Sequence, residues 1–187
     1  MCLTSTHSVA NPPYIGHNAN VMKMNLLSAL FAASLGLGAG AAWATDAGQP
    51  APNFALPNAQ GTIVALDGLR GQVVFVDFWA SWCGPCRRSF PWMNEMQQKY
   101  GGKGFAIVAV NVDKKRSDAD KFLAQIPATF PVVFDEAGTS PTAFGVKGMP
   151  SSYLIDARGN VAFVERGFLE GSRAQLEDRI KVLLASR

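Results

Sequence analysis

Cysteine and histidine are scarce in this chain, with three and two among 187 residues. Cys2, His7 and His17 all precede residue 45, so residues 45–187 hold two cysteines and no histidine. Two thiols without an imidazole cannot complete a Cys2His2 or Cys3His zinc site within one chain. The base of a Ser-His or Cys-His hydrolase is also missing. We therefore expect neither a metal site nor a cofactor.

Charged residues are also rare before residue 45, where Lys23 is the only one. Removing that lysine from 17 Lys and Arg leaves 16 against 14 Asp and Glu in residues 45–187. The basic run Lys114 to Arg116 is soon followed by Asp118 and Asp120, which indicates a solvated loop and helix start. A near-neutral domain without a basic stripe does not favour nucleic acid as a partner.

Residues 1–44 have the pattern of a secretory signal peptide. An apolar run from Leu26 to Gly40 ends at Ala42-Trp43-Ala44, with small residues at the −3 and −1 positions of a cleavage site. Because about 19 apolar residues can just span a bilayer, an uncleaved anchor is the alternative. In either case the membrane is contacted only through this segment, and the remainder is expected in the periplasm or cell envelope.

Residues 1–21 fit this pattern less well because they contain no Lys, Arg, Asp or Glu. A signal peptide normally opens with positive charge, and Lys23 directly follows Met22. The pattern is consistent with a start at Met22 and an over-extended reading upstream. One folded domain is expected over residues 45–187, in keeping with their length.

The two remaining cysteines lie in Trp82-Cys83-Gly84-Pro85-Cys86, directly after the apolar segment 73–79. A strand leading into a helix here would place Cys83 at the helix N-terminus, where the dipole and free N–H groups favour the thiolate. Cys86 would lie one turn further on, close enough to attack a mixed disulfide formed at Cys83. The spacing therefore predicts a dithiol redox centre.

Two other interpretations of this cysteine pair are disfavoured. Arg87 rather than His follows Cys86, which excludes the c-type haem attachment signature. A structural disulfide is possible in an oxidising compartment, but structural bridges usually close longer loops than this one.

Hydrophobic periodicity and turn residues predict an α/β domain. The expected strands span 54–56, 62–64, 73–79, 105–112, 130–134, 152–155 and 161–166, and the expected helices span 87–100, 117–125, 139–144 and a final segment after residue 172. Pro91 predicts a kink or a shortened start in the first helix. Ser172-x-x-Gln175 has the pattern of a capping box. This order predicts a three-layer sandwich, with a mixed central sheet, helices on both faces and an N-terminal β-hairpin.

The chain resembles the thioredoxin superfamily over essentially all of residues 45–187. The stretch from Phe78 to Cys86 is similar to the thioredoxin active-site motif, and Gly148-Met149-Pro150 is similar to its cis-proline loop. Within the superfamily it most resembles the exported TlpA/ResA-type reductases. The matching segments are the N-terminal hairpin, 110–113, 130–135 and 148–156.

This resemblance implies roles for three residues at the dithiol. Cys83 would be the nucleophile, exposed at the helix start, and Cys86 the resolving thiol. Asp77, a charge within an apolar strand, matches the buried aspartate beneath the thioredoxin dithiol. Burial would raise its pKa and let it take the proton of Cys86. The alternative is that strand alternation points Asp77 to a solvated face.

The resemblance also implies a substrate-binding edge. A cis Pro150 would leave the backbone of Met149 free to pair with an extended substrate segment opposite Cys83. A plain turn proline is the alternative. Trp82 is expected to flank the dithiol at the surface, whereas Trp79 is expected to belong to the core.

Two positions depart from the family pattern. Ser89 stands where many ResA-like proteins have Glu shortly after the second cysteine, and Ala109 stands where thioredoxin places a lysine near its buried aspartate. The sequence therefore leaves open whether an acidic side chain adjusts the properties of the thiols here as in that family. It also leaves open the link of that family to cytochrome c maturation. Arg87 and Arg88 are the cations expected near the site.

The predicted function is that of an exported thiol-disulfide oxidoreductase. Gly-Pro between the cysteines resembles thioredoxin, whose potential of about −270 mV is reducing. The implied partners of the expected monomer are disulfide-bearing proteins and a membrane thiol-electron donor. A thiol peroxidase is one alternative, but its Pro-x-x-x-Thr/Ser-x-x-Cys motif requires Pro at Val76 and a hydroxyl at Ala80. A non-enzymatic binding module is another, although it has no use for a dithiol.

Overall fold

Five strands form a mixed sheet within residues 45–187, the part of the chain that the computed structural model describes. They are β3 (Val73–Trp79), β4 (Phe105–Asn111), β5 (Val132–Phe134), β6 (Ser151–Ile155) and β7 (Val161–Arg166). Their order is β5-β4-β3-β6-β7, with β3, β4 and β5 parallel and β6 antiparallel to β3 and β7. The expected mixed sheet is confirmed. The predicted signal peptide, with Cys2, His7 and His17, lies outside the described residues.

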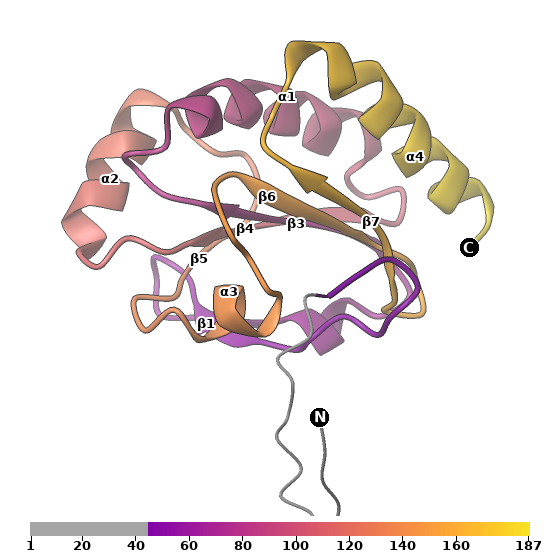
Figure 1. Ribbon diagram of the computed structural model, residues 1–187, viewed down its shortest axis with the longest axis horizontal. Coiled ribbons are helices and arrows are strands. Elements are labelled where there is room, and N and C mark those ends of the chain that lie inside the picture. The colour runs from indigo at the N-terminus through magenta and orange to yellow at the C-terminus, as the bar shows by residue number, and fades with distance from the viewer. Residues whose placement is uncertain (1–44) are drawn as a thin grey trace, which may run out of the picture. The chain divides into compact units, whose positions relative to one another are not determined.

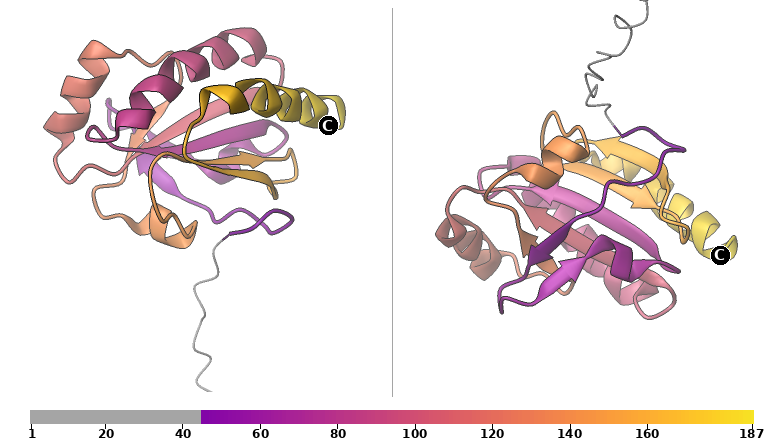
Figure 2. Two further views of the ribbon diagram at one scale, coloured as in Figure 1. Left: turned by 45° about the horizontal axis from the view of Figure 1, so that its top comes forward. Right: turned by 90° about the horizontal axis from the view of Figure 1, so that it is seen from below.

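Two layers cover this sheet (Figure 1), and Figure 2 shows each of them from its own side. The first layer holds α1 (Gly84–Tyr100), α2 (Arg116–Gln125) and α4 (Arg173–Ala185). The second holds the antiparallel hairpin β1 (Ala55–Pro57) and β2 (Ile63–Ala65), the 3-10 helix η1 (Leu66–Leu69) and α3 (Thr139–Ala143). The three-layer architecture and the N-terminal hairpin follow the prediction. No helix among the described residues is both long and apolar enough to cross a membrane.

β3 is the central strand, and all of its residues are buried. Because side chains alternate along a strand, Phe75 and Trp79 pack into the core beneath α1, whereas Val76 and Phe78 pack into the core on the hairpin side. The ring of Trp79 lies 4.8 Å from that of Phe90 on α1, centroid to centroid. These contacts fix the first turns of α1 over the carboxyl end of β3.

Helix α1 begins earlier than its apolar periodicity suggests, at the position indicated by the cysteine motif. It starts at Gly84, three residues before the predicted start at residue 87, and it runs unbroken through Pro91 to Tyr100. A shortened first segment is therefore wrong. Pro91 removes only one N–H donor from the helix, while Phe90 and Met93 beside it are completely buried and hold this part of α1 on the sheet. The other predicted strands and helices are displaced by at most two residues at either end.

The predicted capping box before α4 is also wrong. Ser172 is the last residue of the 3-10 helix η2 (Glu170–Ser172), with φ −87° and ψ −10°, and its side chain caps no N–H group. The hydroxyl donates instead to the carbonyl of Leu169 at 2.9 Å. Because η2 leads directly into α4, Ser172 already has helical backbone angles and bonds back along the chain. Leu176 and Ile180 on α4 pack inward as predicted.

Candidate active site at the Cys83 and Cys86 disulfide

Cys83 and Cys86 are joined by a disulfide at the first turn of α1, with an S–S distance of 2.03 Å. Cys83 is the N-cap residue of the helix, and the N–H of Cys86 donates to its Sγ at 3.2 Å. The first sulfur thus lies at the positive end of the helix dipole and among its free N–H groups. Such a position favours the thiolate once the disulfide is reduced.

Cys83 is less accessible than predicted. Cys83, expected to be exposed, has only 3% of its surface accessible, and Cys86 has none. The reason is that both cysteines pack into the core cluster beneath α1 with Phe75 and Trp79. Of the two cysteine residues, only Cys83 retains any accessible surface.

A buried carboxylate holds the loop in front of Cys83. Asp113, just beyond the end of β4, accepts hydrogen bonds from the N–H of Ser81 at 2.9 Å and from its hydroxyl at 3.0 Å. The side-chain amide of Asn111 donates a third bond to Asp113 at 2.8 Å. The sequence resemblance includes Asp113, but it does not predict that this residue anchors the loop before Cys83. The available signal was a pair of polar residues directly after a buried strand.

Asp77 lies in the buried interior of β3, as expected, and not on a solvated face. Its exposed fraction is 0%, and alternation places it on the same side of the strand as Phe75 and Trp79. The hydroxyl of Ser152 donates to Oδ1 at 2.6 Å, and Oδ2 has no hydrogen-bond partner in residues 45–187. Burial raises the pKa of Asp77 to about 7, although the bond from Ser152 opposes this shift.

The two departures from the family pattern both border the site. Ala109 pairs with Asp77 in the register of β3 and β4, so this neighbouring position carries a methyl group in place of a cation. Ser89 is buried, and its hydroxyl donates to the carbonyl of Cys86 at 3.1 Å. Arg87 reaches toward α2, where it donates to the side chain of Gln125 at 2.7 Å. The immediate surroundings of Asp77 are therefore uncharged on the β4 side.

The peptide bond between Met149 and Pro150 is cis, as the resemblance implied. Ser151, the next residue, pairs with Phe78, so the cis bond lies at the carboxyl end of β3, the end that leads to the disulfide. Neither the N–H nor the carbonyl of Met149 is hydrogen-bonded within the described chain. Trp82 is 72% exposed, as expected for a residue that flanks the dithiol at the surface.

No cluster of three or more His, Cys, Asp or Glu side chains suited to a metal ion occurs in residues 45–187. The chemistry available at this end of the sheet is that of two sulfurs, one buried carboxyl group and a strand-like backbone edge. Together they can exchange a disulfide and move a proton.

Comparison with known proteins agrees with this geometry. Residues 47–164 match the sequence model of the AhpC/TSA family. Thiol-disulfide oxidoreductase ResA from Bacillus thuringiensis subsp. konkukian is 36% identical over 136 residues, which are 73% of this chain and 78% of that protein. ResA from Bacillus subtilis is 35% identical over 125 residues, 67% of this chain and 70% of that protein.

Solved structures show the same fold. The crystal structure of a candidate thiol:disulfide interchange protein DsbE from Chlorobium tepidum aligns with a TM-score of 0.73 and 55% identity, over 75% of this chain and 99% of that chain. The fold is therefore thioredoxin-like, as the sequence indicated. The chain belongs to the AhpC/TSA family and, within it, to the ResA-type thiol-disulfide oxidoreductases.

Proposed function

We propose that this protein reduces disulfides of other proteins in the cell envelope, with Cys83 as nucleophile and Cys86 as resolving thiol. The observation that carries the proposal is the position of the pair, since Cys83 caps α1 and keeps some exposure while Cys86 is completely buried. An external disulfide can be attacked only by the first sulfur, and only the second can complete the reaction from inside.

The reaction proceeds in two exchange steps. The Cys83 thiolate attacks a substrate disulfide, forms a mixed disulfide and displaces the first substrate sulfur as a thiolate, which is then protonated. Cys86 loses its proton and attacks Cys83 Sγ. The Cys83–Cys86 disulfide forms and the second substrate sulfur leaves as a thiol. Two electrons thus pass from the dithiol to the substrate, and an external thiol donor must supply two more for the next cycle.

Asp77 is proposed to accept the proton of Cys86. A carboxyl group with a pKa of about 7 changes its protonation near neutral pH, which is the range in which a general base is most effective. Oδ2, the oxygen without a hydrogen bond, is the one available for this transfer. Its position on the face of β3 beneath α1 supports the proposal.

The cis-proline loop and Trp82 are proposed to hold the substrate. The free N–H and carbonyl of Met149 can pair with an extended segment that carries the substrate cysteine. The exposed indole of Trp82 offers apolar contact beside it. Since all of these groups come from one chain, the protein is proposed to act as a monomer, with a membrane-bound thiol-electron donor as its second partner.

The reduction potential of the Cys83–Cys86 pair determines whether the exported protein reduces or oxidises its substrates. The signal-like residues 1–44 favour the periplasm or cell envelope, where a reductase needs a dedicated donor. We expect the reduction potential of the Cys83–Cys86 pair, measured against glutathione, to lie near that of thioredoxin, about −270 mV. A potential above about −150 mV would reverse the proposed direction.

The proposed roles are tested with insulin as substrate. The wild-type protein should reduce insulin with dithiothreitol as donor, and Cys86→Ser should accumulate a mixed disulfide with the substrate, whereas Cys83→Ser should not. Failure of the wild-type protein to reduce insulin would favour a non-enzymatic binding module. Rapid peroxide turnover would favour a thiol peroxidase, although Val76 and Ala80 lack the proline and hydroxyl of that motif.

A further inference from the structure

We propose that the surface around the dithiol selects substrate segments that carry Asp or Glu close to the reacting cysteine. This inference rests on the proposed function and names a substrate class for the same site. It follows from three exposed cations, Arg88, Lys147 and Arg166, which we call the cationic rim. None of the three has a carboxylate partner in the described part of the chain, so their charge is available to a ligand.

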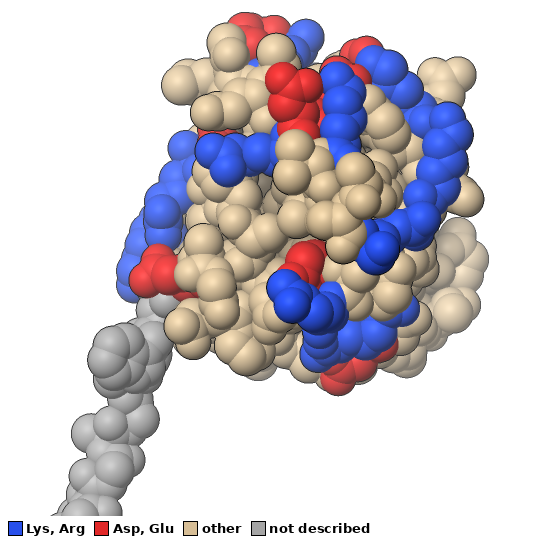
Figure 3. All heavy atoms as spheres, turned by 90° about the vertical axis from the view of Figure 1, so that its right-hand side faces the viewer, with Lys and Arg blue, Asp and Glu red and all other residues tan. Residues whose placement is uncertain are grey.

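Seven of the sixteen Lys and Arg side chains in residues 45–187 form ion pairs, and the three rim cations are among the nine that form none. The Lys and Arg residues that form ion pairs there are Arg70, Lys99, Arg116, Lys121, Arg158, Arg173 and Lys181. Figure 3 shows the side of the molecule on which the C-terminus lies in Figure 1, where blue and red side chains are interspersed.

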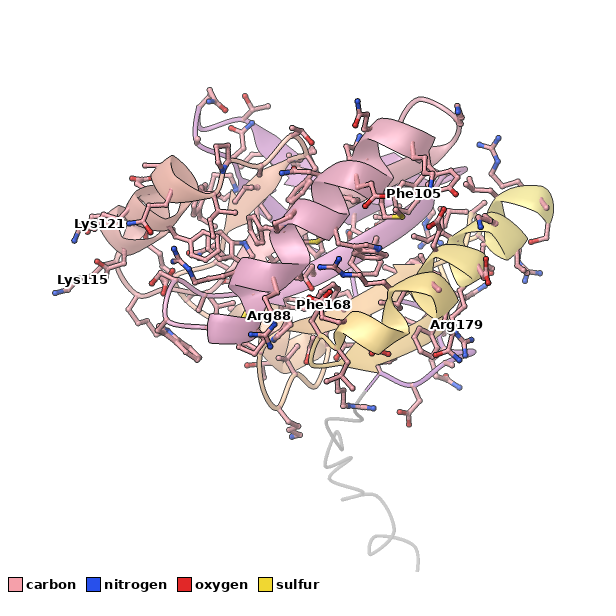
Figure 4. All side chains as sticks on the ribbon, turned by 90° about the horizontal axis from the view of Figure 1, so that it is seen from above. Arg88, Phe105, Lys115, Lys121, Phe168 and Arg179 are labelled. Atoms are coloured by element: carbon pink, nitrogen blue, oxygen red, sulfur yellow. A yellow bond between two sulfur atoms is a disulfide. The ribbon has the colours of Figure 1, made fainter. Side chains whose placement is uncertain are left out.

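Each rim residue is tied to the site by the chain or by strand register. Arg88 follows Cys86 by two residues and stands near the N-terminal end of α1 (Figure 4). Lys147 precedes Met149 by two residues. Arg166 pairs with Ser151 at the ends of β7 and β6. The next residue after it, Gly167, donates its N–H to the carbonyl of Pro150 at 2.8 Å.

Two carboxylates at this end of the sheet, the exposed Glu136 and the partly exposed Glu165, form no ion pair within residues 45–187, and the three rim cations outnumber them. Asp77, Asp113 and Asp135 are buried and hydrogen-bonded. Glu170 is paired with Arg173 at 2.9 Å. Glu165, which pairs with Ser152 in strand register, is only partly exposed.

Two apolar side chains near the site are exposed, Trp82 at 72% directly before Cys83 and Leu169 at 69% two residues after Gly167, and Met149 is partly buried. An extended segment bound over them would bring the residues on either side of its cysteine near Arg88 and Lys147. Complementary charge there raises the rate of encounter and suppresses binding of cationic segments. The fitting partner is therefore a disulfide flanked by acidic residues.

The experiment uses three disulfide-linked peptides of equal length that differ only in the residues flanking the cysteine, which are Glu, Gln or Lys. With the full-length protein at low ionic strength, kcat/KM should be on the order of tenfold higher for the acidic peptide than for the basic one. The difference should shrink at about 0.5 M salt, because exposed charges are then screened within a few ångströms.

Two double variants with the same change in net charge provide the control. Arg88→Glu with Lys147→Glu should invert the preference. Lys103→Glu with Arg187→Glu should leave it as in the wild type, because Lys103 lies beside the start of β4 and Arg187 ends the chain, both away from the carboxyl end of β3. Equal kcat/KM for the three peptides, or an unchanged preference in the rim variant, would overturn the inference alone. Failure to reduce even the Gln peptide would overturn the proposed function as well.

Discussion

The hydroxyl of Ser152 donates a hydrogen bond of 2.6 Å to Oδ1 of Asp77, across the antiparallel pair β3 and β6. The two residues face each other directly in strand register, and both are buried. One carboxyl oxygen is thereby fixed while the other stays unbonded within the described residues. A single serine thus orients the group proposed to receive the proton and partly offsets the rise in its pKa that burial causes.

Ser152→Ala should raise the pKa of Asp77 further above its ordinary value, because the bond from Ser152 lowers it. Loss of a hydrogen bond to a charged group, worth about 1.5 kcal/mol, corresponds to roughly one pKa unit. Carbon-13 NMR titration of the Asp77 carboxyl group measures this shift. Ser151→Ala is the matched control, since that hydroxyl donates to the carbonyl of Gly148 instead. A pKa of Asp77 that stays or falls in Ser152→Ala would contradict the assignment.

Asp77→Asn should remove a pH dependence of stability. The pKa of Asp77 is about 7 in the folded protein, against an ordinary value of 3.8 for a solvated aspartate, so between these values the folded state keeps a proton that the unfolded chain has lost. The free energy of unfolding therefore falls as pH rises through this window, by roughly 1.4 kcal/mol per pH unit. Urea unfolding of the oxidised proteins from pH 4.5 to 8 should show the variant becoming more stable relative to wild type. A constant difference would disprove the shift.

Asp113→Ala should disturb the loop that leads to Cys83. The substitution leaves the N–H and hydroxyl of Ser81 and the amide of Asn111 without their acceptor, which should lower the free energy of unfolding by about 2–4 kcal/mol. We also expect kcat/KM for disulfide reduction to fall by about tenfold, since a small displacement of a reacting group is costly. Asp118→Ala, which removes only an exposed ion pair, should change neither quantity appreciably. Wild-type kinetics in Asp113→Ala would show that the loop needs no anchor.

Asp135→Asn should destabilise the turn that leads into α3, where Asp135 accepts hydrogen bonds from Gly138, Thr139 and Ser140. Burial opposes ionisation of Asp135, but hydrogen bonds from Ser140, Gly138 and Thr139 outweigh it and hold the pKa below its usual range. A lowered pKa contributes stability above the unfolded value and loses it as pH falls through the folded one. We therefore expect the wild type to exceed the variant in unfolding free energy at pH 7, with the gap closing below about pH 4. A gap that widens in acid would be the opposite of this expectation.

Most of the fold could be predicted because its strands are continuous apolar runs between clear turn residues. β3 and β7 match their predicted bounds to the residue. The cysteine motif indicates a helix start at Cys83, but apolar periodicity places the start of α1 only at residue 87, because Gly84 and Pro85 add nothing to the apolar repeat. The capping box at Ser172 failed for a similar reason, since the motif does not reveal the 3-10 turn that precedes the helix.

The local part of the site was predictable and the long-range part was not. The dithiol and the cis-proline loop each lie within a few residues, so a motif describes them. The bond between Ser152 and Asp77 spans 75 positions and the bonds between Ser81 and Asp113 span 32, and only the pairing of strands brings these groups together. The burial of Cys83 likewise depends on how α1 packs over β3.

The disulfide joins residues only three positions apart. Its formation or reduction therefore changes the conformational freedom of only a short stretch of the unfolded chain. In the chain-entropy treatment, closing so small a ring restricts the unfolded chain by about 2 kcal/mol, less than a bridge across a long loop. Folding and reduction then form one thermodynamic cycle, whose four states are the folded and unfolded forms of the oxidised and the reduced protein. The difference in unfolding free energy between the oxidised and reduced proteins equals the difference in dithiol potential between the folded and unfolded chain multiplied by 2F, because two electrons are transferred. Two denaturation curves, one for each redox state, therefore report how far and in which direction folding shifts the potential of the dithiol.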